Sequence, residues 1–177
     1  VITIAEGAGA ETLRLYKSDT LQVDSKSDDS PVSAADLAAH HYIMDRLEGL
    51  IAGVEVISEE SAEARGFEAP TGDRFWLVDP LDGTKEFINQ RDEFTVNIAL
   101  IEHGRPVMGV VVAPALGQTW AGSPEQAIKQ DVGGENRRDI KVRDVPLAGL
   151  TVTASRSHAD PDAQVYLQSG KGRWNAR

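Results

Sequence analysis

The residues best suited to chemistry lie in the segment 79–84, which reads Asp-Pro-Leu-Asp-Gly-Thr. The apolar run 75–78 before it predicts a strand with Asp79 at its carboxyl end, where ligand sites of open sheets tend to lie. Pro80 stiffens the turn, so Asp82 can return to the side of Asp79. Two carboxylates and a turn carbonyl would then form an oxygen-only site, the kind that Mg²⁺ prefers.

Gly83 and Thr84 follow this pair and open a short predicted helix over 85–89. The free backbone N–H groups at such a helix start suit a phosphate oxygen. The alternative interpretation is a tight Asp-Pro turn in which Asp82 merely caps the helix. Residue types and spacing alone favour neither interpretation.

Two further acids stand where elements begin or end. The segment 58–60, Ser-Glu-Glu, follows a predicted strand over 54–57, so Glu59 is a candidate third carboxylate. The alternative is a solvated acidic loop. Asp36 lies three residues after Ser33, which is the spacing of a capping box at a helix start, and that role alone would explain the acid.

These residues need a scaffold, and hydrophobic patterning predicts one. A helix is expected over 1–18, and a second helix begins after Ser33. The apolar face of the second helix is predicted to consist of Leu37, His41, Met44, Leu47 and Ile51, with His41 at the edge of the core. Predicted strands cover 21–23, 54–57, 75–78, 94–101, 106–112, 118–121 and 150–154, and the strands 94–101 and 106–112 are expected to form a hairpin. Residues 61–73 are expected to be loop or ragged helix, 129–146 turn-rich chain, and 160–168 a further helix. We therefore expect an α+β fold with helices on one face of a largely antiparallel sheet.

Composition argues against several classes of partner and site. The chain has 177 residues, with 18 basic and 28 acidic side chains, and its net charge of −10 argues against a nucleic acid polymer as the main partner. The absence of cysteine excludes disulfides, thiolate metal sites and a cysteine nucleophile. No apolar run reaches 18 residues, so no transmembrane helix is expected.

Three segments together resemble one family closely: 26–36, 58–60 and 76–87. They are similar to the Mg²⁺-dependent, lithium-inhibited phosphomonoesterases, a superfamily that includes inositol monophosphatases and fructose-1,6-bisphosphatases. The resemblance is closest to the 3′(2′),5′-bisphosphate nucleotidases of the CysQ type, since Lys85-Glu86-Phe87 after the Gly-Thr is typical of that branch. The segments 94–100 and 155–160 fit the same branch.

The resemblance implies a fold and an activity. The fold would be the N-terminal half of a layered αβαβα sugar-phosphatase fold, with a metal-binding domain over 1–148 and the start of a C-terminal α/β domain over 149–177. The activity would be hydrolysis of the 3′-phosphate of adenosine 3′,5′-bisphosphate to AMP and phosphate. The alternatives are an inositol-phosphate phosphatase, and a chain that binds metal with little or no catalysis. A cytoplasmic location is implied, with a peripheral position at the inner membrane as the alternative.

The resemblance also implies roles for individual residues. Two or three Mg²⁺ ions, with Li⁺ inhibitory, would be held by Glu59 and Asp79 with the carbonyl oxygen of Leu81, by Asp79 with Asp82, and by waters that Glu59 orients. Thr84 and Asp36 would orient the attacking water, so the catalytic residues would be Glu59, Asp36 and Thr84. The substrate would be bound by Gly83, Thr84, Lys85, Ser155, Arg156 and His158.

Two family features are missing. The family's Trp-Asp-x-x-Ala-Gly metal motif and its Gly-Ser-Ser stretch do not occur in this chain, and residues 169–177 do not resemble the family. We therefore expect a second domain that is mostly missing, with an uncovered sheet edge and apolar face. Such surfaces predict self-association of the chain through the incomplete second domain, or exchange of the terminal segment between chains.

Overall fold

The computed structural model describes residues 1–16, 23–25, 31–66, 70–145, 147, 150–152 and 174–176. The chain divides into two compact units, Val1–Ile140 and Lys141–Arg177. The expected domain boundary between residues 148 and 149 stays a prediction. The expected helix over 160–168 and the candidate substrate residues Ser155, Arg156 and His158 lie outside the described residues.

The first unit is built on one seven-stranded sheet with the order β3-β4-β5-β6-β7-β8-β9. Only β3 and β4 are parallel, and every other neighbouring pair in this sheet is antiparallel. The strands are β3 (Glu55–Ser58), β4 (Arg74–Asp82), β5 (Thr95–Glu102), β6 (Arg105–Ala113), β7 (Gln118–Gly122), β8 (Ala127–Asp131) and β9 (Arg138–Asp139). The largely antiparallel sheet expected from the sequence is confirmed.

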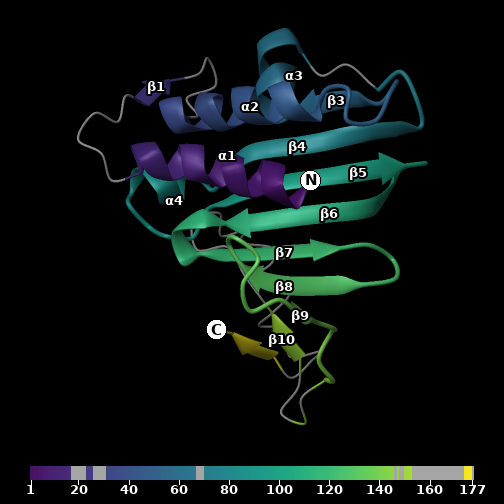
Figure 1. Cartoon of the computed structure of the whole chain (residues 1–177). Helices are drawn as coiled ribbons and strands as arrows, with labels where there is room; N and C mark the ends of the chain where they lie inside the picture. Colours follow the sequence, from purple (N-terminus) through teal and green to yellow (C-terminus); the bar gives the residue numbers. More distant parts are fainter. Residues whose placement is uncertain are drawn as a thin grey trace. The chain divides into compact units, whose positions relative to one another are not determined.

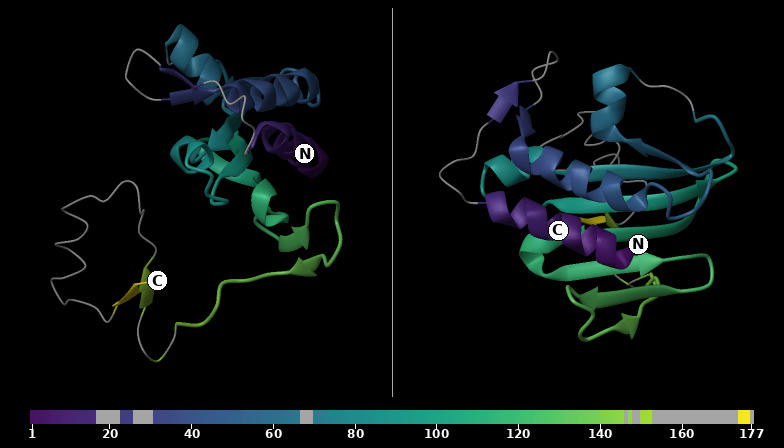
Figure 2. Two further views of the ribbon diagram at one scale, coloured as in Figure 1. Left: turned by 90° about the vertical axis from the view of Figure 1, so that its left-hand side faces the viewer. Right: turned by 45° about the horizontal axis from the view of Figure 1, so that its top comes forward.

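Two long helices, α1 (Ile2–Leu15) and α2 (Ala34–Leu47), lie side by side across one face of this sheet (Figures 1 and 2). Shorter helices are α3 (Glu59–Arg65), α4 (Thr84–Ile88) and the 3₁₀ helix η1 (Pro114–Leu116). The strands β1 (Val23–Ser25) and β2 (Pro31–Ser33) pair antiparallel ahead of α2. In the second unit β10 (Leu150–Val152) pairs parallel with β11 (Trp174–Ala176).

The main core lies between the two long helices and the sheet. Alternate residues of the central strands, among them Trp76, Val78, Ile98 and Val112, are buried there against both helices. Gly7 allows α1 to approach α2 closely, since a Cβ at this position would lie 2.2 Å from the hydroxyl of Tyr42. Gly7 is therefore a packing residue, although glycine inside a helix is intrinsically unfavourable.

The predicted apolar face of α2 is only partly correct: Leu47 is buried and Ile51 packs against the main core, but two other members do not face it. Leu37 is 42% exposed and His41 is exposed, so His41 does not lie at the edge of the core. The buried face carries Ala35, Ala39, Ile43 and Leu47, which recur every four residues. Small alanines fill this face because α2 packs close to α1 and β4, and a search for large apolar side chains overlooks them.

Several elements differ from the sequence-based expectation. The stretch 61–73, expected as loop or ragged helix, begins with the end of α3, which agrees with the helical alternative, whereas the stretch 129–146, expected to be turn-rich, contains most of β8 and all of β9. The polar strand β8 is stabilised from outside itself, because Glu6 of α1 accepts a hydrogen bond from Nε2 of Gln130 at 3.1 Å. Such long-range support leaves no periodic signal in the sequence. None of the helices that the structure describes is long and apolar enough to cross a bilayer.

Candidate active site

The carboxyl end of β4 is held in place by a second, smaller apolar cluster. Leu81 and Phe94 are buried in it together with Ala35, the residue before Asp36. Tyr16 and Phe87 complete it, with ring centroids of Phe87 and Phe94 5.0 Å apart. This cluster joins the first turn of α2 to the end of β4, so segments far apart in the sequence meet where the site residues lie.

β4 is longer than the strand that the sequence predicts over 75–78. β4 continues through Asp82, and its pairing with β5 shifts register between Asp79 and Asp82. This irregularity absorbs Pro80, which has no N–H to donate to a ladder. Asp82 does not cap the helix that follows, since Gly83 occupies the N-cap position of α4.

Gly83 is required by both backbone geometry and space. Its φ is +89°, and a Cβ here would lie 3.1 Å from the carbonyl oxygen of Glu93. The next residue, Thr84, donates a hydrogen bond from Oγ1 to the carbonyl oxygen of Leu81 at 3.1 Å. The proposed cradle residues and the proposed ligand carbonyl therefore form one compact turn, beside which Lys85 is exposed.

Glu59 and Asp79 are brought together by parallel strand pairing. Ser58 of β3 pairs with Val78 of β4, so the next residues along both strands, Glu59 and Asp79, lie side by side. The side chain of Glu59 forms a hydrogen bond with that of Asp79. A hydrogen bond between two acids requires a shared proton, and a bound cation could take the place of that proton.

The electrostatics of Asp79 point to the same need for positive charge. Burial raises its pKa most, the negative charges of Glu59 and Asp82 add to this, and the pKa reaches about 7 in spite of a backbone hydrogen bond from Leu81. Oδ1 of Asp79 is buried and has no hydrogen-bond partner. A divalent cation would satisfy that oxygen and offset the repulsion, so the residues present fit a metal ion.

Asp82 is exposed, and its Oδ2 accepts a hydrogen bond from Nδ2 of Asn97 at 3.4 Å. Asn97 lies opposite Asp79 in the β4–β5 pairing, so the partner of Asp82 is also the cross-strand neighbour of Asp79. Among the residues that the structure describes, no group of three or more acidic, histidine or cysteine side chains is assembled as a metal site. The three-carboxylate ligand set therefore stays a prediction, with Glu59 and Asp79 as its formed part.

The face of the sheet opposite the long helices forms an apolar groove of about 590 Å³. Leu77 and Val111 lie in it and are 45% and 39% exposed, although both are large apolar side chains. Its polar residues are Ser58, Glu59, Asp79 and Asn97. The paired acids thus lie in a groove whose remaining lining is apolar.

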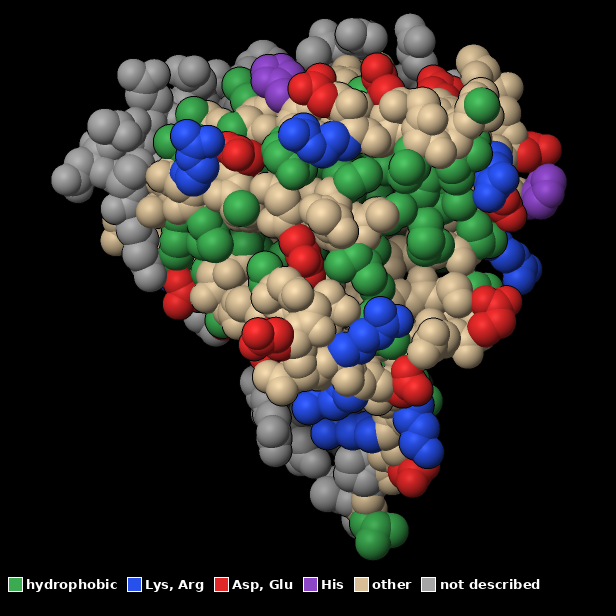
Figure 3. Space-filling model, viewed as in Figure 1, with side chains coloured by type: hydrophobic (Ala, Val, Ile, Leu, Met, Phe, Trp, Pro, Cys, Tyr) green, Lys and Arg blue, Asp and Glu red, His purple; other side chains and the backbone are tan. Residues whose placement is uncertain are grey.

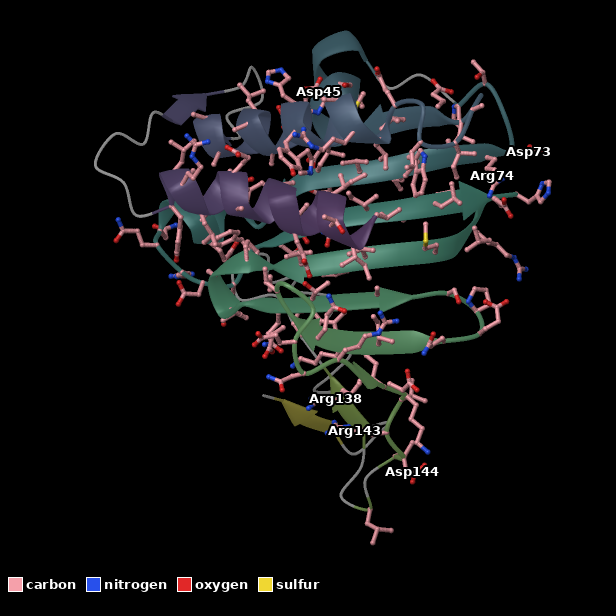
Figure 4. The ribbon with its side chains drawn as sticks, viewed as in Figure 1. Asp45, Asp73, Arg74, Arg138, Arg143 and Asp144 are labelled. Carbon is pink, nitrogen blue, oxygen red and sulfur yellow. The ribbon has the colours of Figure 1, made fainter. Side chains whose placement is uncertain are left out.

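The far end of the sheet and the helix-bearing face differ in character from this groove. Asp73 and Arg74 lie at the start of β4, at the end of the sheet opposite α4 (Figure 4). Arg74 forms an ion pair there with Glu102, with nitrogen and oxygen 2.6 Å apart. On the helix-bearing face acidic and basic side chains are interspersed (Figure 3). The net charge of −10 is therefore not concentrated into one acidic patch on that face.

Sequence reasoning overlooked Asn97 and His40, which support the acids, and did not reveal that Asp36 is buried. Asn97 was part of a predicted strand without a role of its own, and its contact with Asp82 depends on strand register. His40 is hydrogen-bonded through Nδ1 to Oγ of Ser58 at 2.8 Å, next to Glu59. Asp36 is 5% exposed at the first turn of α2, so the predicted capping position is a buried one. No local sequence signal reveals these three placements.

Comparisons with known proteins agree with the motifs. The model of the inositol monophosphatase family matches residues 1–173. The 3′(2′),5′-bisphosphate nucleotidase CysQ of Escherichia coli strain K12 is 47% identical over 172 residues, which are 95% of this chain and 67% of the relative. The corresponding nucleotidase of Buchnera aphidicola is 35% identical over 97% of this chain and 63% of its own length.

Solved structures show the same fold. CysQ from Bacteroides thetaiotaomicron, described as a bacterial member of the inositol monophosphatase family, superposes with a TM-score of 0.75 at 32% identity, covering 98% of this chain and 68% of its own. The Thermotoga maritima IMPase superposes with a TM-score of 0.72 at 23% identity, covering 99% of this chain and 65% of its own, which shows the fold alone. This chain spans about two thirds of the length of the relatives that it matches.

Proposed function

Because the chain belongs to the inositol monophosphatase family, we propose that it is a phosphomonoesterase of the 3′(2′),5′-bisphosphate nucleotidase type. Its reaction would be hydrolysis of adenosine 3′,5′-bisphosphate to AMP and phosphate. The bond between phosphorus and the 3′-oxygen breaks, the oxygen of a water bonds to phosphorus, and a water proton ends on the 3′-oxygen. The observation that carries the proposal is the hydrogen-bonded pair of Glu59 and Asp79, which lie directly after the last paired residues of two parallel strands.

The proposed cofactor is Mg²⁺, held by Glu59, Asp79, Asp82 and the carbonyl oxygen of Leu81. When bound, such an ion lowers the pKa of a water and stabilises charge on the leaving oxygen. Support comes from the buried, unpartnered Oδ1 of Asp79 and from the oxygen-only donor set. Inhibition by Li⁺ and a cytoplasmic location belong to the same proposal and rest on the family resemblance.

The protein groups around the acids would position the water and the substrate. The hydroxyl of Thr84 donates to the carbonyl oxygen of Leu81, so its lone pairs remain available to accept a hydrogen bond from water. We assign Asp36 as the second acceptor for that water. Gly83 and Thr84 present backbone N–H groups to the phosphate that is cleaved, and Lys85 is the candidate contact for the second phosphate.

Phosphate release from adenosine 3′,5′-bisphosphate and from inositol 1-phosphate, each with Mg²⁺ present, tests this function. We expect the bisphosphate to react faster, and we expect Lys85→Thr to reduce the ratio of the two rates. Lys129→Thr is the matched control. Lys129 lies on β8, which β5, β6 and β7 separate from β4 and its acids in the sheet. A higher rate on inositol 1-phosphate would favour the inositol-phosphate phosphatase alternative and refute the nucleotidase.

Two outcomes separate catalysis from metal binding alone. In the first outcome, Mg²⁺ binds to the wild-type chain, but the wild type hydrolyses both substrates no faster than Asp79→Asn does. The alternative of a metal-binding chain with little or no catalysis then holds. If Mg²⁺ does not bind, the metal site itself is wrong. Isothermal titration of the same protein preparations with MgCl₂ distinguishes these two cases.

We further propose that the chain self-associates through the apolar groove. A second copy of the chain is the proposed occupant, since Leu77 and Val111 leave apolar surface on an otherwise acidic protein. Light scattering across a range of protein concentrations tests this. A monomer at all concentrations would refute it.

A further inference from the structure

Ser58 occupies the N-cap position of α3 but does not cap the helix. Its backbone is extended, with φ −112° and ψ 145°, as an N-cap residue should be. A serine here normally accepts a hydrogen bond from a backbone N–H of the first helical turn. No side-chain cap hydrogen bond is present at α3, so the hydroxyl of Ser58 serves another purpose.

That hydroxyl is hydrogen-bonded to Nδ1 of His40, with Oγ and Nδ1 2.8 Å apart. Ser58 is 0% exposed, and a buried hydroxyl requires a partner. His40 is half-buried on α2, one helical turn after Asp36. The same face of α2 therefore carries the candidate water-orienting acid and the partner of Ser58.

We propose that His40 is a positioning residue that holds Glu59 in place through Ser58; this rests on the proposed metal-dependent function. Ser58 is the last residue of β3 and Glu59 is the first residue of α3. The hydrogen bond ties the chain to α2 at the point where strand changes to helix. It thereby fixes where Glu59 begins its helix beside Asp79, at the site where the cation would bind.

The atom that His40 uses makes the proposal specific. Nδ1 is bonded to Cγ of the ring, and the amide group of asparagine places a nitrogen or oxygen at a similar distance along the side chain. The amide of glutamine instead reaches the position of Nε2. Because the asparagine amide offers both a donor and an acceptor, it can bond to the serine hydroxyl in either direction. Asparagine should therefore replace His40, and glutamine should not.

The test is isothermal titration of the whole chain with MgCl₂, supported by thermal melts without metal. We expect His40→Ala, His40→Gln and Ser58→Ala to weaken Mg²⁺ affinity roughly three- to tenfold, the worth of one lost hydrogen bond. His40→Asn should bind within about twofold of the wild type. The double variant of His40→Ala and Ser58→Ala should be no weaker than either single variant, because both remove the same bond.

Control measurements distinguish a positioning role of His40 from a contribution to folding stability alone. His41→Ala, an exposed neighbour on α2, should leave the affinity unchanged. A merely structural role of His40 would lower the melting temperature without metal and leave affinity unchanged, and that result would overturn the proposal. Equal affinity of His40→Gln and His40→Asn would overturn it as well.

The same titrations also show whether the positioning role or the proposed metal site has failed. If the wild type binds Mg²⁺, Asp79→Asn does not, and His40→Ala matches the wild type, only the positioning role fails. If Asp79→Asn binds as well as the wild type, or the wild type does not bind at all, the metal site fails and the positioning role fails with it.

Discussion

Replacing Asp79 by Asn should make the metal-free chain more stable while abolishing its response to Mg²⁺. The wild-type carboxylate is buried beside two other acids, and its pKa is raised to about 7 for that reason. Asparagine has nearly the same shape and no charge. The substitution therefore removes repulsion in the empty site and removes the central ligand of the occupied one.

The sign and size follow from linkage. Because the pKa of Asp79 is raised from 3.8 to about 7, the folded chain binds this proton more tightly than the unfolded chain. Its contribution to stability is complete below pH 4 and is lost as the pH rises to about 7. At about 1.4 kcal/mol for each pH unit the upper limit of that loss is about 4 kcal/mol, and solvent screening at the partly exposed Asp79 could halve it, so the expected range is about 2–4 kcal/mol.

Urea unfolding at pH 4.5 and pH 8, in EDTA and in MgCl₂, checks this. In EDTA the stability gain of Asp79→Asn should be small at pH 4.5 and reach about 2–4 kcal/mol at pH 8. At 100 times the dissociation constant of Mg²⁺, the wild type should gain about 2.7 kcal/mol and the variant nothing. Asp45→Asn is the matched control, because Asp45 is an exposed aspartate on α2 (Figure 4).

Two results would refute the reasoning. If Asp79→Asn is no more stable than the wild type at pH 8 in EDTA, burial and charge do not act on Asp79 as argued. If Mg²⁺ stabilises the variant and the wild type equally, the cation binds elsewhere.

Three further substitutions test the surrounding structure. Leu81→Ala should cost about 2–5 kcal/mol in urea unfolding, since it opens a cavity in the small apolar cluster, and a cost below about 1 kcal/mol would contradict the packing. Gly83→Ala should lower stability by at least about 1 kcal/mol and weaken binding of inorganic phosphate in titrations, because φ is +89° and Glu93 leaves no room; unchanged binding would argue against the cradle. Leu77→Glu should shift the chain toward monomer in light scattering, and an unchanged mass would exclude the groove as the contact.

Short-range sequence signals were enough to predict the structure around the acidic segment 79–84. An apolar strand followed by Asp-Pro-Leu-Asp-Gly-Thr predicts a carboxylate pair and a helix start, and the structure contains β4, Gly83 and α4 in that order. The hairpin of β5 and β6 was also predictable, since two strands rich in valine and isoleucine are joined by a short turn. The α+β class followed from the order of these elements.

Packing partners could not be predicted in the same way. The sequence suggested that Leu37 and His41 face the core, whereas Ala35 and Ala39 do. Both sets have helical spacing, and only the close approach of α2 to α1 and β4 decides between small and large side chains. The strand β8 was missed because its buried Gln130 is satisfied by Glu6, more than a hundred positions away in the chain.

Thus the sequence by itself determined which residues carry charge, which turns they follow and which family they resemble. Tertiary structure alone decided that Glu59 and Asp79 share a hydrogen bond, because that depends on the register of two parallel strands separated by a helix and a loop. It alone decided that His40 holds Ser58 instead of facing solvent. A pKa near 7 for Asp79 arises in the same way, since burial and neighbouring charges exist only after the chain has folded.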